Sequence, residues 1–273
     1  MLARRSLGRP APDDPTLVER LVADMEREIR SDGSVNGAVV ATIWRAHELM
    51  DLGRTGKDVC GRVLDWVLGL QGKPGAFGQG CSRTRHTHRV CEHFISGFFS
   101  PAPPEQRVAP VMFPNGKVFR AEPAARFAIS CLALRAMLRA RVASRTSIER
   151  HGVSLLQLQE LWTDWDGYFA GDAIVAGIHA FAFVPQSDNN LLTRLSALIT
   201  AHQASTGAWP NADLFHTLET LLALGTPEAH AAVRRSLPAL LSRQRPDGSF
   251  GSTAQQERAL IALRSLIWAD QEG

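Results

Sequence analysis

A short turn sequence built around a glycine occurs six times along this chain at nearly constant spacing. The six glycines are Gly33, Gly75, Gly116, Gly167, Gly207 and Gly248, and successive copies are 42, 41, 51, 40 and 41 residues apart. In every copy the residue two positions after the glycine is apolar, and these residues are Val35, Phe77, Val118, Phe169, Trp209 and Phe250. A period in this range is typical of repeat architectures. We therefore expect six similar structural repeats.

Each repeat has the sequence features of a helix, a turn and a second helix. Asp-Gly, Asn-Gly and Pro-Gly favour turns because glycine tolerates positive φ. Sequences after the turns, such as "AIVAGIHAFAFV", are apolar on nearly all sides and predict buried inner helices. Sequences before them, such as "TLVERLVADMEREI", are more amphipathic and predict outer helices. Six such pairs predict an all-α fold, an α6/α6 toroid whose inner helices surround a central cavity.

The third repeat is irregular at the sequence level. Where its outer helix should lie, "SPAPPEQRVAPVMFP" contains prolines that exclude a regular helix. For residues 95–130, the sequence therefore predicts either an irregular helix pair or a β-hairpin around Asn115-Gly116.

Length and composition limit the remaining possibilities. We expect a proline-rich, disordered tail at residues 1–15 and a single toroid domain at residues 16–273. No apolar run reaches 18 residues, and four cysteines are too few for a disulfide scaffold, so we expect a cytoplasmic protein with no membrane span. The net charge of +3 comes without a basic stripe, which argues against nucleic-acid binding. The Arg- and Ala-rich composition is typical of a GC-rich bacterial genome.

Two of the turns carry a more specific motif. "LLSRQRPDGSFG" and "LITAHQASTGAW", with Gln244 and Gln203, resemble the Q-x3-G-x-[FW] motif of squalene–hopene cyclases and protein prenyltransferase β subunits, and Gln71 fits it loosely. The resemblance, to terpenoid-cyclase-like and prenyltransferase-like proteins, covers most of the chain. It implies a toroid whose active site lies at the end of the cavity where the inner helices begin.

Functional motifs of these families match only in part. "TDWDGYF" contains Asp164 and Asp166 but lacks the third acid of the cyclase Asp-x-Asp-Asp motif, and it occupies a repeat turn. "DLFHT" resembles the Asp-x-x-His-Thr zinc motif of prenyltransferases with Asp213 and His216. Asp172 matches the first ligand of that zinc site, but Ile174 stands where the family has cysteine, which puts zinc binding of the family type in doubt.

The segment "GCSRTRHTHRVCEHF" concentrates cysteine and histidine in a few residues. In a helix, His88, Cys91 and Glu92 would share one face. The candidate metal ligands are His88, Cys91 and His93, and zinc is the metal that they would suit. The alternative is that this segment forms the polar start of an inner helix, with Cys91 as a small core residue.

Counting from the turn glycines places further polar residues at the inner-helix starts. The candidate catalytic residues are His216, Asp172, Asp213, His88 and Glu92. The candidate substrate-binding residues are Cys81, His86, Glu122, Arg126, His179 and Trp209. A His–carboxylate pair such as His216 with Asp172 or Asp213 would suit general acid–base chemistry, whereas acids at helix starts also act simply as caps.

These observations predict a natural-product biosynthetic enzyme: a cyclase, isomerase or transferase for an apolar, isoprenoid- or polyketide-like substrate. Aromatic residues make up only 7% of the chain, which favours acid–base chemistry over carbocation chemistry, because aromatic walls stabilise cations. The alternatives are a non-catalytic toroid that binds a lipid-like ligand or a partner protein, and a zinc-dependent prenyltransferase-like enzyme. A peptide-modifying lanthionine cyclase is a less favoured alternative, because this chain lacks the Cys-His signatures of that family.

Overall fold

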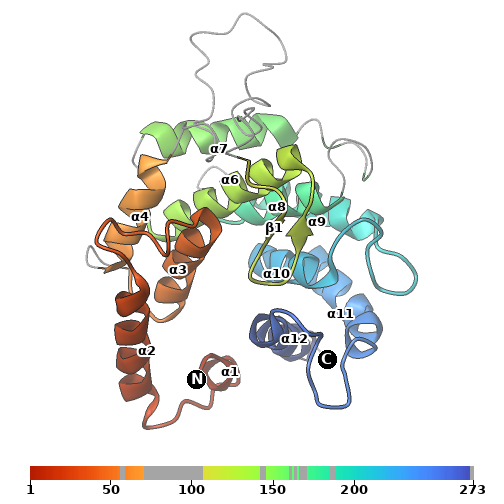
Figure 1. Cartoon of the computed structure of the whole chain (residues 1–273). Coiled ribbons are helices and arrows are strands. Elements are labelled where there is room, and N and C mark those ends of the chain that lie inside the picture. Colours follow the sequence, from red (N-terminus) through yellow and green to blue (C-terminus); the bar gives the residue numbers. More distant parts are fainter. Residues whose placement is uncertain are drawn as a thin grey trace, which may run out of the picture. The chain divides into compact units, whose positions relative to one another are not determined.

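The computed structural model describes residues 1–55, 59–70, 107–141, 146–159, 162, 165, 171–184 and 188–270. These residues are mostly helical, with one two-stranded hairpin, which confirms the all-α class (Figure 1). The helices are α1 (Leu2–Ser6), α2 (Asp14–Glu28), α3 (Val39–Asp51), α4 (Val59–Gly69), α6 (Glu122–Arg139), α7 (Thr146–Leu158), α8 (Gly171–Phe181), α9 (Asn189–Ala201), α10 (Leu214–Leu224), α11 (Pro227–Leu241) and α12 (Gln255–Asp270). Among the described residues, no helix is both long and apolar enough to cross a bilayer.

The chain divides into two compact units. The N-terminal unit comprises residues 12–111 and 119–161, and the C-terminal unit comprises residues 1–11, 112–118 and 162–273. The closure of their helices into one ring therefore stays a prediction.

Within the N-terminal unit, α3 packs against both α4 and α6, and α7 packs against α6. The inner helix α6 is buried without interruption from Ala125 to Met137, as its apolar sequence predicts. This continuous burial also takes two arginines, Arg126 and Arg135, out of solvent.

Within the C-terminal unit, the inner helices α8, α10 and α12 contact one another in sequence order. The outer helices α9 and α11 also contact each other and pack beside α10 (Figure 1). Every residue of α8 except Asp172 is buried. This arrangement of inner beside inner and outer beside outer is the one expected for stacked helix pairs.

The repeat turns share one hydrogen-bonding pattern. Gly33, Gly116, Gly207 and Gly248 have φ between 82° and 92°, and each glycine N–H donates to the carbonyl three residues earlier at 2.8–2.9 Å. In all four turns, the side chain before the glycine accepts from the N–H after it, at 2.9–3.5 Å. The predicted turns at Gly75 and Gly167 lie outside the described residues.

The motif glutamines and the apolar residues complete the turns. Gln203 donates its amide N–H to Gly207 O at 2.9 Å, and Gln244 donates to Gly248 O at 3.3 Å. Val35, Trp209 and Phe250 are buried, whereas Val118 is half-buried. Phe77 and Phe169 lie outside the described residues. Trp209 donates its indole N–H to Ile199 O at 2.9 Å, so it acts as a plug beneath its turn.

The third turn is the tip of a β-hairpin. Strands β1 (Val111–Met112) and β2 (Val118–Phe119) pair around Asn115-Gly116, and the Ala109-Pro110 peptide bond is cis. The hairpin alternative is therefore confirmed for this part of residues 95–130, and the inner helix that follows is α6.

The N-terminus differs from the expected disordered tail. Residues 2–6 form α1, which packs against α12 in the C-terminal unit. Pro10, Pro12 and Pro15 follow this short helix, and α2 begins only at Asp14. Pro10 and Pro12 thus lie between the two helices, and Pro15 lies in the first turn of α2, where proline is tolerated.

We predict that Gly207→Ala destabilises the protein more than Gly248→Ala. Both glycines have positive φ, where alanine costs roughly 1–2 kcal/mol. A Cβ at Gly207 would lie 2.3 Å from Arg235 O, whereas at Gly248 the nearest atom is 3.9 Å away. Overpacking at Gly207 should therefore add about 1–3 kcal/mol, measured by chemical denaturation. Equal losses in the two variants would contradict this packing of the turn against α11.

We also predict that His47 makes stability fall below neutral pH. Burial, followed by the charges of Arg135 and Arg139, holds the pKa of His47 well below 6.5, and its hydrogen bond with Leu132 O offsets only part of this. The unfolded chain therefore binds a proton near pH 6.5 that the folded chain does not. Relative to His47→Gln, the wild type should lose up to about 1.4 kcal/mol per pH unit below 6.5. Parallel stability–pH curves for the two proteins would rule this out.

Candidate functional site

The starts of three inner helices and the hairpin tip form a cluster of charged residues in the C-terminal unit. Asp172 lies at the second position of α8 and is the one residue of that helix that is not buried. Its Oδ1 accepts a hydrogen bond from the Asp213 N–H at 2.8 Å, and its Oδ2 forms an ion pair with Lys117 Nζ. The N–H of Asp172 donates to Asn211 O at 3.1 Å. Asp172 therefore connects α8 to the loop before α10 and to the hairpin tip.

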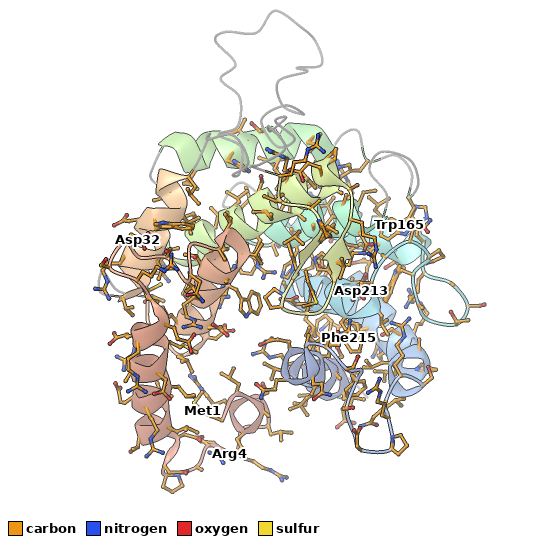
Figure 2. The ribbon with its side chains drawn as sticks, viewed as in Figure 1. Met1, Arg4, Asp32, Trp165, Asp213 and Phe215 are labelled. Carbon is orange, nitrogen blue, oxygen red and sulfur yellow. The ribbon has the colours of Figure 1, made fainter. Side chains whose placement is uncertain are left out.

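Asp213 is the N-cap of α10. Its Oδ1 accepts from the N–H groups of Phe215 and His216, both at 3.0 Å. Its Oδ2 lies 4.0 Å from Arg258 Nη2 on α12. Figure 2 labels Asp213 and Phe215 where the start of α10 meets α12. The capping role expected for such an acid is thus present, and the second carboxylate oxygen faces a cation.

Arg258 and Asn115 fix the hairpin tip to the helices. Arg258 donates from Nε to Asn115 O at 3.0 Å, and its guanidinium carbon lies 4.9 Å from the ring centre of Phe215. Asn115 donates from Nδ2 to Glu219 Oε2 at 3.2 Å. A Cβ on Gly116 would lie 2.6 Å from Arg258 Nη2, so the tip closely approaches this side chain.

The electrostatics of the cluster are dominated by burial. The Asp172 side chain is 21% exposed. Burial raises the pKa of Asp172, and the hydrogen bond and charge of Lys117, together with the Asp213 N–H, offset only part of that rise. The charge of Asp213 acts in the same direction as burial. Asp172 thus keeps its proton to higher pH than an ordinary aspartate.

Two buried histidines lie farther along the inner helices. The ring centres of His179 on α8 and His216 on α10 are 6.2 Å apart, and that of Phe113 lies 6.4 Å from that of His216. The expected association of Asp172 with His216 is indirect, because Asp213 accepts from the His216 N–H and donates its own N–H to Asp172. Side-chain acid–base coupling of Asp172 with His216 stays a prediction.

The other predicted site residues are distributed as follows. Glu122 and Arg126 belong to the N-terminal unit, where they form an ion pair at 2.7 Å. Trp209 is the plug described above. Cys81, His86, His88, Cys91, Glu92 and His93 lie outside the described residues, as do Asp164 and Asp166.

For a metal, the described part of the chain contains no group of three or more His, Cys, Asp or Glu side chains positioned to hold an ion. Ile174, at the position of the family's thiolate, is fully buried. The zinc site proposed for the segment around His88 remains untested.

Sequence reasoning missed Lys117, Arg258, Asn115 and Glu219. The hairpin predicted as an alternative around Asn115-Gly116 could have indicated Lys117 and Asn115, because it brings its tip to the end of a helix. Arg258 lies on α12, where its side chain reaches Asn115 O at the hairpin tip.

Comparison with known proteins gives no family assignment. No protein-family model matches the chain, and no curated protein matches it. The resemblance to terpenoid cyclases and prenyltransferase β subunits therefore stays a prediction that rests on the turn motifs.

We predict that Asp172→Asn becomes more stable relative to the wild type as pH rises. The folded-state pKa of Asp172 lies above its ordinary value of 3.8, so the folded chain holds this proton more tightly than the unfolded chain. The stabilising contribution of protonated Asp172 is present below pH 3.8 and is lost as pH rises through the folded pKa. Denaturation of both proteins at several pH values measures the difference. A difference that stays constant or shrinks with rising pH would show that burial does not dominate at this site.

Proposed function

We propose that this chain is an isomerase or cyclase that transfers protons on a carbonyl-bearing, apolar small molecule. The observation that carries the proposal is Asp172, a partly buried carboxyl group with a raised pKa beside a lysine ammonium group. Perturbed acids with a specific charged neighbour are concentrated at functional sites. The proposed setting is the terpenoid-cyclase-like α/α toroid indicated by the turn motifs.

Each charged group has a role in this chemistry. Asp172 would remove a proton from the carbon next to a substrate carbonyl and return it at another position, which is general acid–base catalysis. The Lys117 ammonium group would stabilise the negative charge that develops on the carbonyl oxygen. Arg258 and Asn115 would hold the hairpin tip, and hence Lys117, in position.

The direction of the pKa shift favours a carbonyl substrate over a polyene. Protonation of an isolated carbon–carbon double bond requires a strong acid, and burial makes Asp172 a weaker acid than usual. A carboxylate whose pKa is raised is a stronger base, which suits proton removal next to a carbonyl. The polyketide-like substrate class is therefore preferred here to the isoprenoid class.

A second candidate is a non-catalytic protein that binds a lipid-like ligand or a partner protein. It is favoured by the contacts of Lys117, Asp172, Asn115 and Arg258, which bind the hairpin tip to α8 and α12 as a structural clamp would. The zinc-dependent alternative has less support, because the buried Ile174 supplies no ligand.

The test is deuterium incorporation next to the carbonyl of 2-dodecanone in D2O, followed by NMR. The wild type should accelerate exchange, and Asp172→Asn, which keeps an acceptor for the Asp213 N–H, should reduce the enzymatic rate by roughly a hundredfold or more. Asp270→Asn, at the exposed end of α12, is the matched control and should leave the rate unchanged. Squalene is the comparison substrate.

Several outcomes would overturn the proposal. Cyclisation of squalene without exchange in the ketone would favour a polyene cyclase. Exchange that is unaffected in Asp172→Asn would remove this residue from the chemistry. Absence of any turnover, together with saturable binding of the ketone, would favour the non-catalytic candidate.

A further inference from the structure

Arg126 in the N-terminal unit is a buried cation that is only partly hydrogen-bonded. Its side chain is 2% exposed, and its Nε donates to Glu122 Oε1 at 2.7 Å. Its Nη2 is buried and has no hydrogen-bond partner in the part of the chain that the structure describes. A guanidinium group keeps its charge inside proteins, and a buried donor without an acceptor is destabilising.

Glu122 is already engaged by other donors. Its Oε2 accepts hydrogen bonds from the N–H groups of Val108 and Ala109 at 3.0 and 2.8 Å. Its Oε1 accepts from Arg126 and also lies 3.2 Å from the Val108 nitrogen. Glu122 therefore holds the backbone before β1 and contacts Arg126 through one nitrogen only. The bidentate pairing that guanidinium and carboxylate groups commonly form is absent between these two described residues.

The guanidinium group is directed at the start of α6. Arg126 bonds to a residue four positions earlier, as expected for a long side chain that points toward the helix N-terminus. The N-cap residue Ala121 makes no side-chain capping bond. The positive end of the 18-residue helix and the guanidinium group thus favour an anion at the same place.

We propose that Arg126 and the first turn of α6 bind the carboxylate group of an apolar ligand. The site lies within the N-terminal unit, so the proposal goes beyond the proposed function, which rests on Asp172 in the C-terminal unit. The charges favour a monoanion over a phosphate, because Glu122 already neutralises Arg126 and would repel a dianion. Binding would supply the acceptor that Nη2 lacks.

The experiment compares binding of three amphiphiles with the same alkyl chain: dodecanoate, 1-dodecanol and dodecyl phosphate. Calorimetric titration of the full chain, below the micelle-forming concentrations, gives the affinities without any turnover. The wild type should bind dodecanoate most tightly. Arg126→Met should weaken dodecanoate binding by roughly tenfold or more while leaving dodecanol binding unchanged. Arg126→Lys keeps the charge, so its affinity for dodecanoate should lie between those of the wild type and Arg126→Met. It replaces the methionine variant in the test if that variant does not fold.

Two variants act as controls. Arg139→Met removes another ion-paired arginine of α6, about 20 Å along the helix from Arg126, and should keep the preference for dodecanoate. Asp172→Asn should also keep it, which separates this site from the proposed acid–base chemistry. The proposal would be overturned if the wild type bound dodecanoate and dodecanol equally, or bound dodecyl phosphate more tightly than dodecanoate. It would also be overturned if Asp172→Asn lost the preference for dodecanoate while Arg126→Met kept it.

Discussion

The glycine turn is the constraint on which both units depend. Positive φ at the glycine lets its N–H reach the carbonyl three residues back, and the preceding side chain then satisfies the N–H that follows. A Cβ at Gly33 or Gly207 would collide with the backbone of α4 or α11, so the turn also sets how closely the next outer helix approaches. In the two turns at Gly33 and Gly207, the glycine therefore fixes both the backbone before the inner helix and the packing of that backbone against an outer helix.

This regularity explains which parts of the site follow from sequence. Asp172 and Asp213 stand five and six residues after their glycines, and the contact between α8 and α10 brings them together. The described turns and the alternation of inner and outer helices in the C-terminal unit follow from local sequence patterns. Lys117 was not predicted, because its position depends on a hairpin that replaces a helix, and the sequence left both alternatives open.

The properties of the buried polar groups were beyond sequence reasoning. The apolar pattern of α6 predicts burial of the helix but does not show where Arg126 or Arg135 finds an acceptor. The low pKa of His47 results first from burial and then from Arg135 and Arg139 on another helix. Such effects depend on distances between side chains far apart in sequence, whereas periodicity describes one helix at a time.

A comparison of Glu122 with Asp172 shows how equivalent positions acquire different properties. Both are acids at the start of an inner helix, where the helix dipole favours negative charge. Burial acts to raise the pKa of Glu122, but the N–H groups of Ala109 and Val108, with Arg126, outweigh it and leave that pKa below its usual value. Asp172 receives one backbone N–H and one lysine, and burial prevails. The number of donors around each acid thus decides whether its pKa falls below or rises above the ordinary value.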